Sequence, residues 1–165
     1  MAVFRPKEIL NTYTDLDIEN LRKRGFDTIL IDVDNTIAIP NTGTCDEKAE
    51  QFLNDLKKAG FKVLIFSNNS EKRVKMFIRD IDVDYIYLAL KPLPFGYLRA
   101  MKKAGSKPET TIVLGDQLMT DILGANLSGC YGIYTKLLQE KDSAMTAINR
   151  RIEKFVWRNI LHEEV

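Results

Sequence analysis

The sequence predicts an α/β fold, a Rossmann-like three-layer sandwich in which helices cover a five-stranded parallel sheet. Short strand-type runs alternate with helix-type segments, a pattern typical of parallel strands joined by right-handed crossovers. The run at 28–33 is almost continuously apolar up to Asp32, as expected of a strand buried on both faces. Because an isolated buried charge is unfavourable, Asp32 and Asp34 should lie at the carboxyl end of this strand, where parallel sheets bind their ligands.

The first helices are predicted from their end signals. Residues 17–24 have the pattern of a short helix that Gly25 ends. A longer helix should follow the first strand and its loop. Its capping box is expected at Thr44 and Glu47, and Gly60 should end it.

The rest of the sheet follows in regular alternation, with apolar side chains at helical spacing in the helices. The expected elements are strands at 62–66, 85–90, 110–114 and 131–134 and helices at 71–79, 95–103 and 120–127. We expect a single domain over 1–165, with its core at about 28–134 and a C-terminal helix at about 143–161.

The composition is that of a globular, water-soluble protein, with 45% hydrophobic and 28% charged residues. The net charge of +1 does not favour a nucleic-acid partner. No run is apolar for long enough to cross a bilayer, and the first residues lack a secretion signal. Cys45 and Cys130 have neither metal-ligand nor disulfide-framework spacing. A cytoplasmic, reducing location is expected, although a matrix or stromal protein would have the same pattern, and peripheral membrane contact is left open.

Polar residues follow four successive strands of the predicted sheet. They are Asp32 and Asp34, then Ser67, then Lys91, and then Asp116 with Asp121. A single aspartate in such a place is more often a helix cap or turn residue, so the prediction depends on the whole set. Carboxylates for a divalent cation, a hydroxyl group and a fixed positive charge are together what phosphoryl transfer requires.

These residues resemble, in chain order, the four motifs of the haloacid dehalogenase-like phosphatases. The matches are 32–36 (DVDNT), Ser67, Lys91, and Gly115 and Asp116 through Asp121. The resemblance covers roughly residues 28–134 and implies the fold of that family. The loop at 35–45 is too short for an inserted domain, and Leu90 runs directly into Lys91. No large cap domain is therefore expected.

The resemblance implies a reaction through an aspartyl-phosphate. Asp32 would be the nucleophile, since a carboxylate with a reference pKa of about 3.9 is ionised at neutral pH. Asp34 would be the general acid and then the general base. The similar transport ATPases have threonine there, so Asp34 favours a phosphatase. Lys91 would neutralise nucleophile and phosphate, and Ser67 would donate to a phosphoryl oxygen. Asn68 and Asn69 would shape the phosphate site, with loop capping as the alternative.

The cofactor that the resemblance implies is Mg²⁺, which suits a sparse oxygen site completed by water and substrate. Its ligands would be the side chains of Asp32 and Asp116 and the main-chain carbonyl of Asp34. Asp121 would orient Lys91 or a metal-bound water. Thr36 would be structural and hold the loop after the first strand, and Gly115 would be a further supporting residue.

The substrate is predicted from the absence of a cap. Open sites of this family serve large substrates, such as phosphoproteins, nucleic-acid ends or lipid head groups. A compact, uncapped chain is similar to the YqeG-like proteins of subfamily IIIA, which are related to the phosphatidylglycerophosphate phosphatases. That resemblance implies a phosphorylated lipid head group as the partner. The basic, amphipathic pattern at 143–161 fits either a helix on an anionic membrane or a helix that covers the sheet.

Other functions stay open. A phosphatase of this family could act on a protein or a soluble phosphate ester. A non-catalytic phosphate-binding or scaffold protein is a further alternative, against which the intact Asp32 and Asp34 argue. A response-regulator receiver would need its acid pair and phospho-acceptor on different strands.

Overall fold

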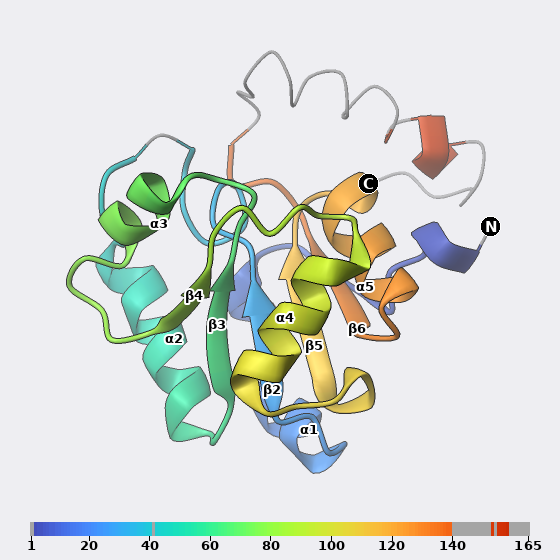
Figure 1. The fold of residues 1–165 in the computed structure, drawn as a ribbon, viewed down its shortest axis with the longest axis horizontal. Helices are drawn as coiled ribbons and strands as arrows, with labels where there is room; N and C mark the ends of the chain where they lie inside the picture. The colour runs from blue at the N-terminus through green and yellow to red at the C-terminus, as the bar shows by residue number, and fades with distance from the viewer. Residues whose placement is uncertain (1, 41, 140–152, 154, 159–165) are drawn as a thin grey trace.

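The computed structural model describes residues 2–40, 42–139, 153 and 155–158. Its centre is a parallel sheet of six strands in the order β1-β6-β5-β2-β3-β4 (Figure 1). The strands are β1 (Glu8–Leu10), β2 (Thr28–Ile31), β3 (Lys62–Phe66), β4 (Asp84–Ile86), β5 (Thr111–Gly115) and β6 (Tyr131–Thr135).

The prediction of five strands was wrong by one, because the N-terminal segment adds β1 to the edge of the sheet. Glu8 lies opposite Ile133 of β6, and Lys7 donates its N–H to the Gly132 carbonyl at 2.8 Å. The strand is only three residues long and partly exposed, so it has neither the apolar run nor the alternation that indicates a strand in sequence.

The central strand, β2, sets the position of everything at its carboxyl end. All four of its residues are buried, as the apolar run predicts. Ile31 lies opposite Ile65 of β3 on one side and Leu114 of β5 on the other. The residues that follow these three strands therefore emerge at the same edge of the sheet.

Helices cover both faces of the sheet, which confirms the three-layer α/β architecture. They are α1 (Ile18–Lys23), α2 (Glu47–Lys58), α3 (Glu71–Phe77), α4 (Pro94–Ala104) and α5 (Leu123–Leu127). Ile29 and Ile31 belong to a core cluster with residues of α1, α2 and α3, whereas Leu30 belongs to a cluster with residues of α4 and α5. Alternate side chains of β2 thus face opposite layers. Figure 1 shows α4 across the near face.

The predicted capping box at Thr44 was wrong. The N-cap of α2 is Asp46, whose carboxylate accepts the N–H of Ala49 at 2.8 Å. Glu47 is therefore the first residue of the helix and cannot reach back to a cap three residues earlier. The end at Gly60, with φ of +87°, agrees with the prediction.

The strand predicted at 85–90 is shorter in the structure. β4 ends at Ile86, and Leu88 and Leu90 have φ values of +44° and +58°, which a strand does not allow. This segment instead bonds to the polar end of β3, since Ala89 donates to the Ser67 carbonyl at 3.0 Å. The short loop from β4 to α4 holds no folded insertion.

The helix predicted at 120–127 begins earlier, with a π-helical turn at Leu118–Ile122 that leads into α5. The helix predicted at 143–161 lies largely outside the described residues. Of its described residues, Val156 and Trp157 are buried in a cluster with Leu118, Ile122 and Tyr134. In the part of the chain that the structure describes, no helix is both long and apolar enough to cross a membrane.

Candidate active site

Four of the predicted site residues meet at the carboxyl edge of the sheet. Asp32 follows β2 and Asp116 follows β5, while Asp121 comes from the π-helical turn and Lys91 from the loop after β4. All four side chains are buried. The strand register and the loop geometry, rather than proximity in the chain, bring them together.

Lys91 is held between two carboxylates. Its Nζ donates to Asp32 Oδ1 at 2.7 Å and to Asp121 Oδ1 at 2.6 Å. Burial by itself would lower the pKa of Lys91, but the carboxylates of Asp121 and Asp32 outweigh it and hold the pKa above its ordinary value. Lys91 is therefore a permanent positive charge at the bottom of the site.

For Asp32, in contrast to Lys91, the surroundings disfavour the charged form. Burial, with a smaller contribution from the charges of Asp121 and Asp34, raises the pKa of Asp32 to about 6 despite the stabilising charge of Lys91. One ammonium group does not compensate all the carboxylates around it. The site thus carries unbalanced negative charge.

That unbalanced charge is suited to a divalent cation. Asp32, Asp116 and Asp121 each offer a carboxylate oxygen, and these atoms lie within 4.8 Å of one another. Three carboxylates and the ammonium group of Lys91 leave a formal charge of −2. The residues therefore fit a hard cation with oxygen ligands, such as Mg²⁺.

Thr36 and Gly115 support the acidic residues. Thr36 Oγ1 donates to Asp116 Oδ1 at 3.2 Å, which joins the loop after β2 to the end of β5. A Cβ atom at Gly115 would lie 2.2 Å from Asp121 Cγ, so only glycine leaves room for the Asp121 carboxyl group. Gln117 N–H also donates to Asp121 Oδ2 at 3.1 Å.

Tyr97 of α4 is a supporting residue that the sequence did not indicate. Its hydroxyl donates to the Thr120 carbonyl at 2.9 Å, which ties α4 to the π-helical turn that carries Asp121. A Cβ atom at Gly124 would lie 2.2 Å from the Tyr97 hydroxyl oxygen. In sequence, Tyr97 is indistinguishable from an ordinary apolar-face residue of α4.

The side chain of Asp34 has partners outside the group of Asp32, Asp116 and Asp121. Asn69 Nδ2 donates to Asp34 Oδ2 at 2.6 Å, and Arg73 of α3 donates to Asp34 Oδ1 at 2.7 Å. Arg73 also donates to the Gly43 carbonyl at 3.2 Å. Sequence reasoning missed Arg73, because no local pattern links a helix arginine to an aspartate 39 residues away. It placed Asn69 near the phosphate site or in a loop cap, and did not predict its bond to Asp34.

Ser67 and Asn68 lie at the end of β3 next to Lys91. Ser67 is buried, and its Oγ accepts the N–H of Asn69 at 3.2 Å. Asn68 makes a pair of bonds with the Lys91 backbone, at 2.8 Å from Lys91 N–H and 3.1 Å to Lys91 C=O. The structure thus shows Asn68 positioning Lys91, and its contact with a substrate stays a prediction.

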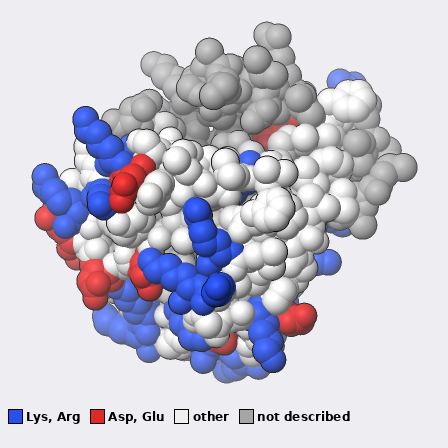
Figure 2. Space-filling view, in the orientation of Figure 1, with Lys and Arg blue, Asp and Glu red and all other residues white. Residues whose placement is uncertain are grey.

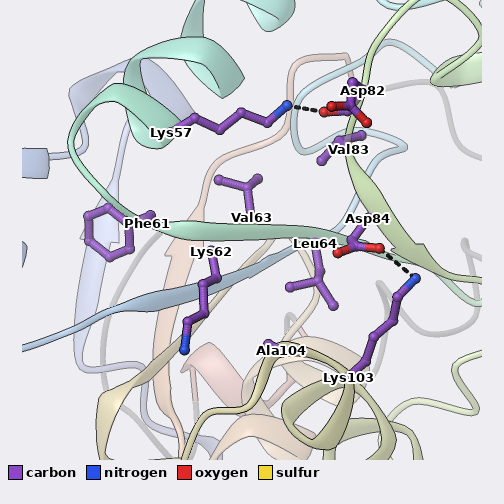
Figure 3. A pocket seen from close by; sticks show the side chains of 10 residues that line it. All are labelled: Lys57, Phe61, Lys62, Val63, Leu64, Asp82, Val83, Asp84, Lys103 and Ala104. Atoms are coloured by element: carbon purple, nitrogen blue, oxygen red, sulfur yellow. Dashed lines mark hydrogen bonds and ion pairs between the residues drawn. The ribbon is translucent and has the colours of Figure 1, made fainter.

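A separate cavity of about 540 Å³ lies at the opposite edge of the sheet (Figure 3). It is lined by residues around the amino ends of β3 and β4, including Lys57 and Lys103, and by none of the predicted site residues. Lys57 donates to the Asp82 carbonyl, and Lys103 pairs with Asp84 at 2.7 Å. Since these ammonium groups are already engaged, the cavity has no comparable set of reactive groups.

Comparisons with known proteins agree with the geometry. The family model described as "Hydrolase: haloacid dehalogenase-like hydrolase" matches residues 5–129. The chain is 33% identical over 151 residues to "Probable phosphatase YqeG" of Bacillus subtilis (strain 168), covering 92% of this chain and 88% of that protein.

Solved structures share the fold. An uncharacterized protein from Listeria monocytogenes serotype 4b aligns with a TM-score of 0.57 at 16% identity, over 78% of this chain and 98% of that one. The cobalt-bound deoxy-D-mannose-octulosonate 8-phosphate phosphatase of Haemophilus influenzae aligns with a TM-score of 0.56 at 16% identity, over 73% and 71%.

Proposed function

The chain belongs to the haloacid dehalogenase-like hydrolase family, and from this premise we propose that it is a Mg²⁺-dependent phosphomonoester hydrolase. The observation that carries the proposal is the buried cluster in which Lys91 joins Asp32 to Asp121 beside Asp116. A phosphatase of this kind needs a carboxylate nucleophile, a fixed positive charge and a cation site within reach of one phosphoryl group.

Asp32 is the proposed nucleophile. Its Oδ1 accepts from Lys91, so we assign the attack on phosphorus to Oδ2. The new bond joins Asp32 to phosphorus, and the bond from phosphorus to the ester oxygen breaks. Lys91 remains charged throughout and stabilises negative charge on the nucleophile and on the phosphoryl oxygens.

Asp34 is the proposed general acid and base. It donates its proton to the departing alkoxide, and then accepts a proton from the water that attacks the aspartyl-phosphate. That second attack breaks the bond between phosphorus and Asp32, releases inorganic phosphate and regenerates both carboxyl groups. Arg73 and Asn69 bind the Asp34 carboxylate, and its side chain is only partly covered, which suits contact with a leaving group.

The side chains of Asp32 and Asp116, with the main-chain carbonyl of Asp34 that the resemblance implies, would hold Mg²⁺, which supplies further neutralisation of phosphoryl charge when bound. The donor set supports this assignment, since hard oxygen atoms and unbalanced negative charge favour such a cation. Ser67 would donate its hydroxyl proton to a phosphoryl oxygen.

The proposed substrate is phosphatidylglycerophosphate. Removal of its terminal phosphate is a step in phosphatidylglycerol synthesis. One observation supports a large substrate of this kind: no folded insertion covers the site in the described loops that follow β2 and β4. The similarity to "Probable phosphatase YqeG" over nearly the whole chain supports phosphate-ester hydrolysis. The proposal also places the protein in the cytoplasm, with access to a membrane surface.

Phosphate release from phosphatidylglycerophosphate in mixed micelles tests the proposal, with wild type and Asp32→Asn compared in Mg²⁺ and in EDTA. We expect wild-type turnover that EDTA abolishes and that Asp32→Asn lowers by about a thousand-fold or more. A soluble ester serves as the second substrate. Turnover of that ester without turnover of the lipid would reject the lipid assignment, and turnover of neither would reject the phosphatase.

A further inference from the structure

Half of the large exposed apolar side chains gather in one stretch beside the candidate active site. Twelve such side chains are exposed among the described residues, and six of them lie between positions 87 and 98. They are Tyr87, Leu88, Leu90, Leu93, Phe95 and Leu98, and we call them the apolar rim. The other six are scattered along the chain. Single exposed apolar residues are ordinary, but a contiguous group next to a site indicates a contact surface.

The backbone holds the apolar rim in place. Leu88 and Leu90 have positive φ values, a conformation that leucine rarely adopts. Their exposure is therefore not the result of a relaxed loop. Leu88 N–H donates to the Asn69 carbonyl at 3.0 Å, and Leu93 N–H donates to the Leu90 carbonyl at 2.8 Å.

The loop and the start of α4 form one continuous surface. A Cβ atom at Gly96 would lie 1.9 Å from the Ala89 carbonyl oxygen, so the absence of a side chain lets the helix contact the loop backbone directly. Lys91 lies in the middle of this stretch, with its side chain buried between Asp32 and Asp121. A molecule or surface that contacts the apolar rim is therefore also close to the site that contains Lys91.

The charges around the apolar rim indicate what covers it. Residues 85–108 contain four lysines, one arginine and no acidic residue, and one of the lysines is the buried Lys91. Lys103 pairs with Asp84, and Arg99 and Lys102 lie exposed on α4. Arg99 also donates to the Tyr87 carbonyl at 2.9 Å, which holds its guanidinium group beside the apolar rim. Figure 2 shows uncharged surface over the amino-terminal half of α4 and its preceding loop, with Lys and Arg side chains gathered over the carboxyl-terminal half. Exposed leucine and phenylalanine next to basic side chains are complementary to an anionic bilayer surface.

We propose that the apolar rim docks on the surface of an anionic lipid bilayer and presents the site of Asp32 and Lys91 to phosphorylated head groups. The inference rests on the proposed function for the lipid nature of the substrate, and extends it by naming the docking surface. Leu93, Phe95 and Leu98 enter the interfacial region, while Arg99 and Lys102 contact lipid phosphates. Membrane contact is thereby assigned to the β4–α4 region.

Sedimentation of the full chain with vesicles tests this inference. One set contains phosphatidylglycerol and phosphatidylcholine, and the other contains phosphatidylcholine alone. We expect wild type to bind the anionic set, and Leu93→Gln/Phe95→Gln/Leu98→Gln to bind at least about ten-fold less. The matched control is Met76→Gln/Leu127→Gln, which replaces exposed apolar side chains elsewhere and should bind like wild type. Arg99→Gln/Lys102→Gln should lose the preference for anionic vesicles.

Hydrolysis of a soluble ester separates this inference from the proposed function. The triple variant should hydrolyse p-nitrophenyl phosphate as wild type does, because none of its substitutions lies in the catalytic cluster. The docking surface is rejected if the wild type does not bind anionic vesicles, or if the triple variant binds them as well as the wild type does. In either case, turnover of the soluble ester would still support the phosphatase. Self-association in the absence of lipid that the triple variant abolishes also overturns it, in favour of a second copy as the occupant. Vesicle binding that depends on the apolar rim in a protein that turns over no ester supports the surface and rejects the phosphatase.

Discussion

Arg73 and Asp34 form an ion pair at 2.7 Å although they lie on different elements and 39 residues apart. The guanidinium group also donates to the Gly43 carbonyl at 3.2 Å, so it links α3 to two points of the loop after β2. The pair is partly buried, with side-chain exposures of 15% and 24%. It therefore determines where the proposed general acid points, and Arg73 is a positioning residue for Asp34.

Replacing Arg73 should slow the step that needs a proton. Arg73→Ala is expected to lower kcat/KM for an alkyl phosphate by about ten- to a hundred-fold, because a misplaced acid protonates its leaving group poorly in the first phosphoryl transfer. The loss should be much smaller for p-nitrophenyl phosphate, whose leaving group needs little protonation. Steady-state kinetics with both esters measures the difference.

The matched control for Arg73 is Arg79→Ala, since Arg79 pairs with Asp80 on the exposed surface. It should leave both rates unchanged. Equal losses of kcat/KM on the two esters in Arg73→Ala would contradict the positioning role in the first step and would instead indicate a general structural defect.

The stability of the metal-free protein should depend on the ionisation of Asp32. Its pKa is raised from 3.8 to about 6, so the folded state binds this proton more tightly than the unfolded state. The stabilisation is fully present below pH 4 and is lost as the pH rises through about 6. The loss amounts to about 2–3 kcal/mol, from a shift of about two pKa units.

Urea unfolding of wild type and Asp32→Asn in EDTA measures this contribution. Asparagine cannot ionise, so the free energy of unfolding of the variant should rise relative to that of wild type by about 2–3 kcal/mol between pH 4 and pH 7. A difference that does not change with pH would show that burial does not disfavour the Asp32 charge. Added Mg²⁺ should stabilise wild type at pH 7 more than the variant.

Asp116 should decide the affinity for a divalent cation. Asp116→Asn is expected to weaken Mg²⁺ binding by a hundred-fold or more, and Thr36→Val by about ten-fold, because the hydroxyl of Thr36 orients the Asp116 carboxylate. Isothermal titration of the metal-free protein measures both effects without reference to turnover. Asp84→Asn, at the opposite edge of the sheet, is the matched control and should bind Mg²⁺ like wild type. Unchanged affinity in Asp116→Asn would remove Asp116 from the metal site.

Gly115 should tolerate no side chain. Gly115→Ala would place a Cβ atom 2.2 Å from Asp121 Cγ, so either the strand end or the Asp121 carboxyl group must move. We expect a loss of about 2–3 kcal/mol in the free energy of unfolding, together with loss of turnover as Asp121 leaves Lys91. Gly43→Ala is the comparison, because nothing lies within 4 Å of a Cβ atom there, and its stability should change by about 0.5 kcal/mol or less. Full stability in Gly115→Ala would show that the site can rearrange.

The sequence by itself determined the architecture of the core and the identity of the residues at its carboxyl edge. A buried parallel strand must be apolar along its length, so β2 was evident, and its two aspartates could lie only at its end. Apolar spacing and end signals, such as the helix end at Gly60, predicted the helices. These are local patterns, and physical chemistry acting over a few residues is sufficient to produce them.

Only the tertiary structure decided which remote groups meet. The pairing of β1 with β6, the ion pair of Arg73 with Asp34 and the two bonds from Asn68 to the Lys91 backbone each join segments that share no pattern in sequence. The leucines of the β4–α4 loop are exposed for the same reason, since hydrogen bonds to the Ser67 and Asn69 carbonyls, just after β3, hold this backbone out of the strand conformation that its composition favours. Such contacts depend on the register of the sheet and the packing of the helices, which arise only when distant parts of the chain are brought together.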